Sequence, residues 1–295
     1  MSQLHQFLNK LRRIKKNFGY SVQDLTRSFN QSSKIINHKE IRVIGLKRSG
    51  NHAIINWISK QHGENVTHLN DLQVKANPYR SLYEYHRTEK LRQEALGNFT
   101  EKELLIYSYE DQLLEDIVHP SFENKHDLYL GKSAKRYDVL ILRDPFNCFA
   151  SRVKMYINLN QDKKKEILIT NESVKLWLNH AKEFLGETQF LNNKICVNYN
   201  LWCADIDYRR KLAEELGLEF TDAEFEQVRS YGGGSSFEGM NLSGQASKMK
   251  LTERWKLMLD NPDFVKLICD PELIKYSNKI FGEMSGLELL LQEIS

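Results

Sequence analysis

The sequence has few of the residues that mark disulfide-rich or disordered proteins. Its 295 residues include four cysteines, five prolines and fifteen glycines. The cysteines form no CxxC pair and no disulfide framework, so we expect reduced thiols in a cytosol-like compartment. So few prolines and glycines leave little room for disordered linkers. The chain is therefore expected to fold throughout most of its length, without disulfides.

The chain also lacks a long apolar run and a strong excess of one charge. No apolar stretch approaches the roughly 18 residues that span a bilayer. The first residues, MSQLHQFLNKLRRIKK, contain no signal-peptide core. A formal net charge of +3 is too small to predict nucleic acid as the main partner. We expect a soluble cytoplasmic protein that binds no nucleic acid.

Residues 1–38 are predicted to form a separate, basic and amphipathic helical arm. Its apolar positions near helical spacing are Leu4, Phe7, Leu8, Leu11 and Phe18, and its cations are Lys10, Arg12, Arg13, Lys15 and Lys16. Such a helix can lie on an anionic membrane surface, so weak membrane contact through residues 1–20 is one alternative. More often the apolar stripe packs on the helix's own domain, and we favour this second interpretation.

Residues 39–295 alternate short buried strands with helices. Strands are predicted over residues 41–46, 66–69, 104–109, 139–142 and 194–199, and helices over 51–61, 146–156, 173–185 and 208–216. Strands that are apolar on both faces and separated by helices indicate a parallel sheet covered on both sides. The sequence thus predicts a single α/β domain with a central parallel sheet, and irregular insertions over 70–100 and 157–172.

The residues that follow the predicted strands are where a ligand is expected. In open α/β sheets, ligands bind outside the carboxyl ends of the strands. Those positions read Lys47-Arg48-Ser49-Gly50, Glu110-Asp111, Arg143-Asp144-Pro145 and Asn200. Two of these strand–helix connections, called corners below, carry cations. The N-termini of the helices that follow point their N–H groups to the same place. This pattern predicts an anionic ligand.

The first cationic corner is not a Walker A loop. A lysine would have to follow Gly50 directly, but Asn51 and His52 stand there. The shorter loop can wrap one anionic group with its backbone amides, while Lys47 or Arg48 adds positive charge. An ordinary strand–turn–helix connection is the alternative.

The second cationic corner pairs Arg143 with Ser151, eight residues further on. Arginine offers a planar fork to a phosphate, and eight residues of turn and helix bring the serine hydroxyl back near the strand end. The alternative is a structural turn followed by an ordinary helix. A third candidate is the glycine-rich stretch 229-RSYGGGSSFEG-239, where Ser235 and Ser236 can contribute to an amide nest or belong to a flexible surface loop.

The two motifs GLKRSGNHAIINWI and ILRDPFNCFASR, about a hundred residues apart, resemble those of sulfotransferases that use 3′-phosphoadenylyl sulfate (PAPS). In that family a short loop after the first strand binds the 5′-phosphosulfate, and a strand-end arginine with a serine eight residues on holds the 3′-phosphate. Arg48 falls where the family usually has its catalytic lysine. Asn51 and His52 stand where threonines are common. Arg143 and Ser151 match the family in type and spacing.

Three further segments extend the resemblance. LLIYSYED ends at Glu110, in the slot of the family's catalytic base, and KICVNYNLW places Tyr199 on a family tyrosine. The segment GQASKMKLTERWK is similar to the basic segment that closes over the nucleotide, through Trp255 and scattered cations such as Lys248. The family's Arg-Lys-Gly triplet is absent from it.

The resemblance implies transfer of a sulfuryl group from PAPS to a hydroxyl of a carbohydrate, a lipid or a small alcohol. The product nucleotide is adenosine 3′,5′-bisphosphate (PAP), and the in-line displacement depends on positioning and charge neutralisation. It needs no metal ion where cations are in place. Residues expected to bind PAPS are Lys47, Arg48, Ser49, Gly50, Asn51, His52, Arg143, Ser151, Tyr199, Ser235, Ser236, Lys248 and Trp255.

The sequence leaves more than one candidate for each catalytic role. Either Lys47 or Arg48 can stabilise the charge that builds on the leaving oxygen. Glu110 is the first choice for the general base and His52 the second; further candidates are His68, Glu84 and His86. The alternative functions are a P-loop-type nucleotide kinase or NTPase, and a non-catalytic module that binds sulfated or phosphorylated ligands.

Overall fold

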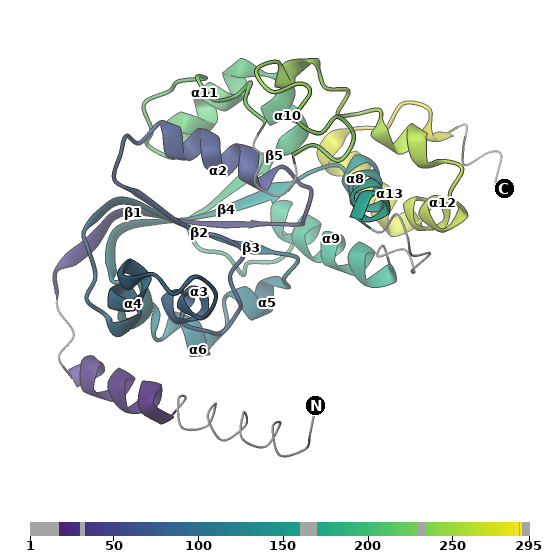
Figure 1. Cartoon of the computed structure of the whole chain (residues 1–295). Helices are drawn as coiled ribbons and strands as arrows, with labels where there is room; N and C mark the ends of the chain where they lie inside the picture. Colours follow the sequence, from purple (N-terminus) through teal and green to yellow (C-terminus); the bar gives the residue numbers. More distant parts are fainter. Residues whose placement is uncertain (1–17, 30–32, 160–169, 229–233, 289, 291–295) are drawn as a thin grey trace.

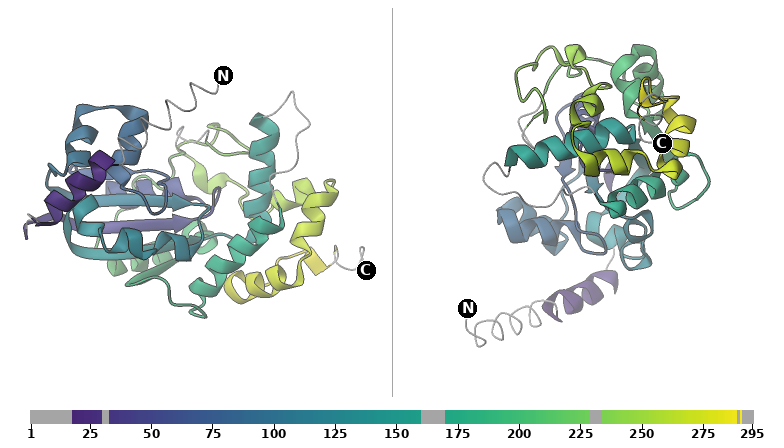
Figure 2. Two further views of the ribbon diagram at one scale, coloured as in Figure 1. Left: turned by 90° about the horizontal axis from the view of Figure 1, so that it is seen from below. Right: turned by 90° about the vertical axis from the view of Figure 1, so that its right-hand side faces the viewer.

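The computed structural model describes residues 18–29, 33–159, 170–228, 234–288 and 290 (Figure 1). At its centre lies a five-stranded sheet with the order β2-β3-β1-β4-β5. All neighbouring strands run parallel. Helices cover both faces of this sheet, so the predicted α/β fold with a central parallel sheet is confirmed (Figures 1 and 2).

The five strands occur where the sequence predicts them. They are β1 (Ile35–Gly45), β2 (Val66–Leu69), β3 (Lys102–Glu110), β4 (Lys132–Leu142) and β5 (Lys194–Asn198). In the ladders, Gly45 aligns with Glu110 on one side and with Ile141 on the other. The carboxyl ends of the three central strands therefore meet at one edge, as parallel topology requires.

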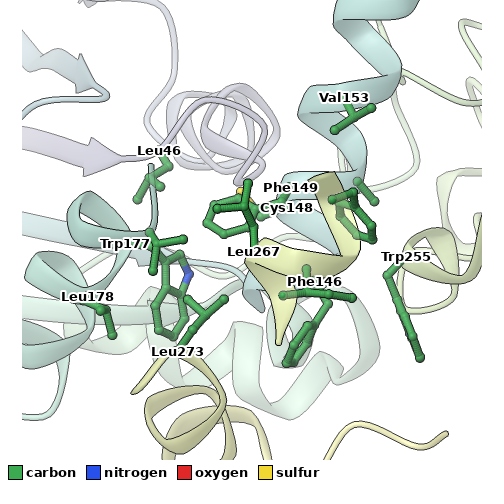
Figure 3. Packing of buried hydrophobic residues seen from close by; sticks show 14 of the residues in the cluster. Leu46, Phe146, Cys148, Phe149, Val153, Trp177, Leu178, Trp255, Leu267 and Leu273 are labelled. Atoms are coloured by element: carbon green, nitrogen blue, oxygen red, sulfur yellow. The ribbon is translucent and has the colours of Figure 1, made fainter. Parts of the chain in front are cut away.

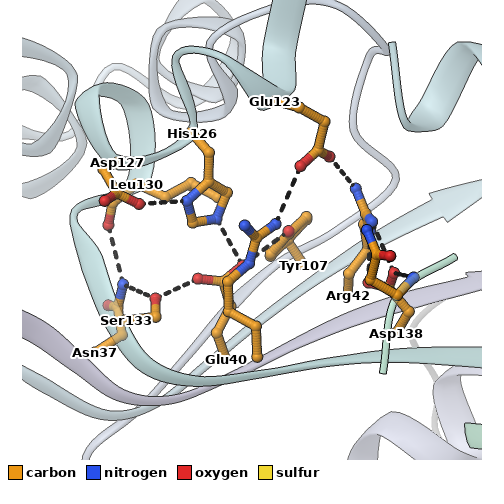
Figure 4. Close-up of polar contacts among 12 residues, drawn as sticks. Asn37, Glu40, Arg42, Tyr107, Glu123, His126, Asp127, Leu130, Ser133 and Asp138 are labelled. Carbon is orange, nitrogen blue, oxygen red and sulfur yellow. Dashed lines mark hydrogen bonds and ion pairs between the residues drawn. The ribbon is translucent and has the colours of Figure 1, made fainter. Parts of the chain in front are cut away.

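β1 and β4 begin earlier than predicted, and their first halves carry polar residues that form a network around the buried Glu40 (Figure 4). The Glu40 carboxylate accepts hydrogen bonds from His126 Nε2 at 2.7 Å, Tyr107 Oη at 2.9 Å and Arg136 Nε at 3.2 Å. The hydroxyl of Ser133 is a fourth donor. Buried charge is tolerated only where it is paired in this way, so apolar patterning alone misses these strand halves.

Two apolar layers fix the sheet between helices. One face packs on α2 (Asn51–Lys60), α10 (Tyr199–Ala204) and α11 (Ile206–Glu215). The opposite face packs on shorter helices, which are α3 (Pro78–His86), α4 (Glu89–Leu96), α5 (Leu114–Ile117), α6 (Pro120–Glu123) and α7 (His126–Leu130). The expectation that 70–100 is irregular is wrong where α3 and α4 form. Capping by Asn77 and Thr88 starts these two helices.

A third apolar cluster lies beyond the carboxyl edge of the sheet (Figure 3). It joins α8 (Pro145–Leu159) and α9 (Asn171–Phe184) to the C-terminal elements η2 (Arg254–Met258), α12 (Pro262–Ile268) and α13 (Pro271–Phe281). The 3-10 turn η1 (Ala246–Lys248) precedes η2. Trp255 is 1% exposed and packs on Phe146. This cluster holds the C-terminal segment against the strand ends.

All four cysteines are free thiols. Across the described ranges, no helix is both long enough and apolar enough to cross a bilayer. Of the predicted arm, the structure describes a helix over residues 18–29, whereas residues 1–17 lie outside the described part of the chain.

Candidate functional site

A cavity of about 680 Å³ opens at the carboxyl edge of the sheet. It lies between the ends of β1, β3 and β4, the start of α2, and the C-terminal segment around η1 and η2. Ten of the residues predicted for the site line it, namely Lys47, Arg48, Gly50, Asn51, His52, Glu110, Arg143, Ser151, Tyr199 and Ser235. The two sequence motifs therefore meet at one cavity.

The turn from β1 into α2 depends on Gly50. Its φ of 87° lies in the left-handed region, and a Cβ built there would come within 1.9 Å of the Tyr199 ring. Gly50 is also the N-cap of α2 and offers it no side-chain hydrogen bond. A helix N-terminus without a side-chain cap at the rim of a cavity favours a negatively charged ligand.

The neighbouring cations Lys47 and Arg48 have different partners at the cavity. Arg48 has a φ of 72°, and its guanidinium donates to Ser151 Oγ at 3.4 Å and to the Gly234 carbonyl at 2.9 Å. The ammonium of Lys47 instead lies 3.5 Å from the Asp71 carboxylate. The left-handed backbone at Arg48 accompanies this separation of two adjacent side chains.

Arg143 lies at the same end as Arg48 and is 2% exposed. Its guanidinium donates to two backbone carbonyls, those of Arg48 at 3.1 Å and Leu251 at 2.9 Å. Within the described chain, Arg143 Nε is buried and makes no hydrogen bond. A buried guanidinium that is bonded to carbonyl groups and keeps an unused donor is suited to an anionic ligand.

Arg254 completes this cationic end, and the sequence analysis did not single it out. Its guanidinium donates to Glu238 at 2.6 Å and to Ser235 Oγ at 3.1 Å. Among the described residues, Arg254 Nε is a second buried donor with no partner. Its position directly before Trp255, in the basic C-terminal segment, is the signal that sequence reasoning could have used.

The three guanidiniums of Arg48, Arg143 and Arg254 repel one another. Burial, followed by the charge of Arg143, lowers the pKa of Arg48 and also that of Arg254. The carboxylate of Glu238 partly offsets the charge at Arg254. Clustered cations in a partly buried cleft raise the local concentration of anions, so this part of the cavity is suited to an anionic ligand.

The cavity also carries two proton acceptors, Glu110 and His52. Glu110 is 8% exposed, and its Oε1 accepts a hydrogen bond from Asn51 Nδ2 at 2.8 Å. Burial raises the pKa of the Glu110 carboxyl, and the charge of Asp71 adds to the rise, while Asn51 and Lys47 oppose it. His52 Nε2 lies 3.9 Å from Glu110 Oε1. Burial, with Arg48 adding to it, lowers the pKa of His52, which favours the neutral imidazole.

Four residues predicted for the site do not line the cavity. The Ser49 hydroxyl is buried against the sulfur of Cys148 at 3.6 Å, and Trp255 belongs to the core. Lys248 is exposed on η1. Ser236 accepts a hydrogen bond from Ser151 at 3.2 Å and so stands behind it. Residues 229–233 of the glycine-rich stretch lie outside the described part of the chain.

The remaining candidate bases, His68 on β2 and Glu84 and His86 on α3, do not line the cavity. His68 nevertheless interacts with His52, and burial together with His52 lowers the pKa of His68 to about 4. Phe225 lines the cavity and was not predicted; Arg209 stacks on its ring at 3.8 Å. Tyr199 stacks on Trp202 with ring centroids 6.0 Å apart. These rings form an apolar wall next to the cationic end.

Together the fold and the cavity define an α/β protein with a cleft lined by arginines at the carboxyl edge of a parallel sheet. No protein-family model matches the chain, and no curated protein matches it. Among solved structures, the chain is similar to a mouse sulfotransferase, SULT7A1 complexed with PAP. The alignment covers 94% of this chain and 93% of the mouse chain. The two sequences are 13% identical, and the TM-score is 0.45.

Proposed function

We propose that this protein is a sulfotransferase that moves a sulfuryl group from PAPS to a hydroxyl of a carbohydrate, a lipid or a small alcohol. One observation carries the proposal. Arg48 and Ser151, 103 residues apart, lie within 3.4 Å, and Arg143 is bonded to the Arg48 backbone at 3.1 Å. The loop after β1 and the Arg–Ser pair after β4 thus form one site, as binding of a doubly phosphorylated nucleotide requires.

The residues present fit PAPS in charge and in size. A volume of about 680 Å³ falls in the usual range for pockets that take drug-sized ligands. Arg48, Arg143 and Arg254, with Ser151, would hold the 3′-phosphate, where the unpartnered Nε atoms of Arg143 and Arg254 are available as donors. The N-terminus of α2 would hold the 5′-phosphosulfate. The apolar wall with Phe225 would take the adenine.

The structure supports Lys47 rather than Arg48 as the cation nearest the reaction. The charge of Lys47 helps to lower the pKa of Glu110. The Arg48 guanidinium, which also interacts with Glu110, is held by Ser151 Oγ at 3.4 Å and by the Gly234 carbonyl at 2.9 Å. An ammonium at that position would stabilise negative charge on the leaving oxygen. Arg48 would then bind the nucleotide, and Lys47 would assume the role that the resemblance gives to a lysine.

Glu110 is the proposed general base. When bound, PAPS supplies the sulfuryl group and leaves as PAP. Asn51 Nδ2 donates a hydrogen bond to the Glu110 carboxylate at 2.8 Å. Burial raises the pKa of Glu110, so Glu110 is a better proton acceptor than an exposed carboxylate. The neutral His52 beside it is positioned to bind the acceptor hydroxyl or to share its proton.

Thermal-shift measurements with the full chain test the proposed ligand. PAP should raise the unfolding temperature, and ligand at a hundredfold excess over Kd stabilises a fold by about 2.7 kcal/mol. Arg143→Met should lose this shift, whereas Arg92→Met, an exposed arginine on α4, should keep it. A shift with ATP–Mg²⁺ but none with PAP would establish a kinase or NTPase instead.

Turnover is tested separately, by incubation with PAPS and a panel of carbohydrate, lipid and small-alcohol acceptors. A sulfated product that disappears in Glu110→Gln is the expected result. Tight binding of PAP without any product, over a panel that contains each acceptor class, would favour the non-catalytic binding module.

A further inference from the structure

The helix over residues 18–29 turns its polar side toward the domain. Its buried or half-buried positions are Tyr20, Gln23, Asp24 and Arg27. Asp24 is 8% exposed and forms a two-pronged ion pair with Arg80 of α3, at 2.6 and 3.0 Å. The contact that anchors this helix is therefore ionic and not apolar.

The opposite side of the same helix is apolar and faces solvent. The exposed fractions are 72% for Phe18, 47% for Val22, 62% for Leu25 and 87% for Phe29. With about 100° per residue, this stripe is centred about 180° from the buried polar side. The prediction that the arm packs its apolar side on the domain is wrong at Phe18. The apolar positions at 4–11 lie outside the described residues.

The inner contacts hold the helix in this orientation. Besides the ion pair, the Arg80 guanidinium lies 4.2 Å from the Tyr20 ring centroid. Arg27 donates to the Leu128 carbonyl at 2.5 Å, and Gln23 donates to the Leu96 carbonyl at 3.4 Å. Rolling the apolar stripe inward would break a buried ion pair, which is strongly unfavourable. Figures 1 and 2 show the helix outside the layer of α3 and α4.

We propose that this stripe (Phe18, Val22, Leu25 and Phe29) docks on an anionic lipid surface. The charge of the sequence argues for lipid: residues 1–23 contain five lysines and arginines and no acidic residue. Exposed apolar side chains that lie in sequence next to cations are typical of helices that rest in the headgroup layer of anionic membranes. A second copy of this chain would instead bring two sets of like charges together.

Co-sedimentation with vesicles tests the proposal on the full chain. The wild type should bind vesicles of phosphatidylcholine mixed with phosphatidylserine, bind pure phosphatidylcholine weakly, and be released by high salt. The variant Phe18→Ser/Leu25→Ser/Phe29→Ser should lose at least about tenfold in binding, since it removes most of the apolar area. Leu257→Ser is the matched control, because that leucine is 64% exposed elsewhere and its loss should change nothing.

Circular dichroism on each variant checks that it is folded. Substitutions at such exposed positions should leave the unfolding temperature unchanged. Three outcomes would overturn the proposal: no binding by the wild type, equal binding by the triple variant, or an equal loss in the Leu257 control. A fourth is sedimentation of the wild type as a dimer that the triple variant converts to monomer, which would assign the stripe to self-association.

Discussion

Glu40→Gln should destabilise the fold in a manner that depends on pH. Glu40 is 1% exposed and accepts hydrogen bonds from His126, Tyr107, Arg136 and Ser133. Burial alone raises the pKa of this carboxyl, but the charge and hydrogen bond of His126, with Arg136 and Ser133, lower it to about 2. The neutral amide of glutamine cannot replace these charge-assisted contacts.

The size of the effect follows from that pKa. A fall from the ordinary value of 4.5 to about 2 corresponds to about 3 kcal/mol of unfolding free energy at neutral pH. Because the pKa of Glu40 is lower in the folded state, this contribution is complete above pH 4.5 and is lost as the pH falls toward 2. By pH 3 roughly half of it should remain.

Burial alone lowers the pKa of His126, but Glu40 raises it above 6.5. The contribution of His126 is therefore present below pH 6.5 and is lost as the pH rises through the raised value. The acid branch, between pH 5 and pH 3, isolates the contribution of Glu40.

Urea unfolding followed by circular dichroism from pH 5 to pH 3 measures the contribution of Glu40. The difference between wild type and Glu40→Gln should be about 3 kcal/mol at pH 5 and should shrink toward pH 3. Glu101→Gln is the matched control, since Glu101 also pairs with a histidine, His38, but at the surface, and its midpoint should not move. A Glu40→Gln variant with the wild-type midpoint, or with the wild-type pH profile, would refute this reasoning.

Three further predictions concern the site. Gly50→Ala should lose the thermal shift with PAP and unfold at lower urea than Gly63→Ala, because both glycines have positive φ but only Gly50 has a tyrosine ring within 1.9 Å of the added Cβ; equal midpoints would contradict this. The wild-type kcat should fall as the pH drops through the raised pKa of Glu110, and a Glu110→Gln variant that keeps this acid limb in its pH–rate profile would exclude Glu110 as the base. Lys47→Met should mainly lower kcat, whereas Arg48→Met should mainly raise the KM for PAPS; the reverse pattern would exchange their roles.

The sequence predicted the sheet and one end of the cavity because both depend on short-range patterns. Apolar runs separated by helical segments predict parallel strands, and parallel strands place their carboxyl ends at one edge. Arg143 and Ser151 were therefore expected beside the loop at Gly50, and they lie there. The polar starts of β1 and β4 escaped prediction, because the burial of Glu40 depends on partners such as His126 from distant segments and much of the start of β4 is exposed.

What the sequence alone determined is the order of the elements, the α/β fold and the gathering of cations at the strand ends. The direction of each side chain was decided only by the tertiary structure. Lys47 and Arg48 are neighbours with the same charge, and a left-handed backbone at Arg48 separates them. Arg254 reaches the cavity through contacts with Glu238 and Ser235. The helix over 18–29 turns its apolar side outward while Asp24, Gln23 and Arg27 contact distant segments, and such long-range contacts leave no local signal.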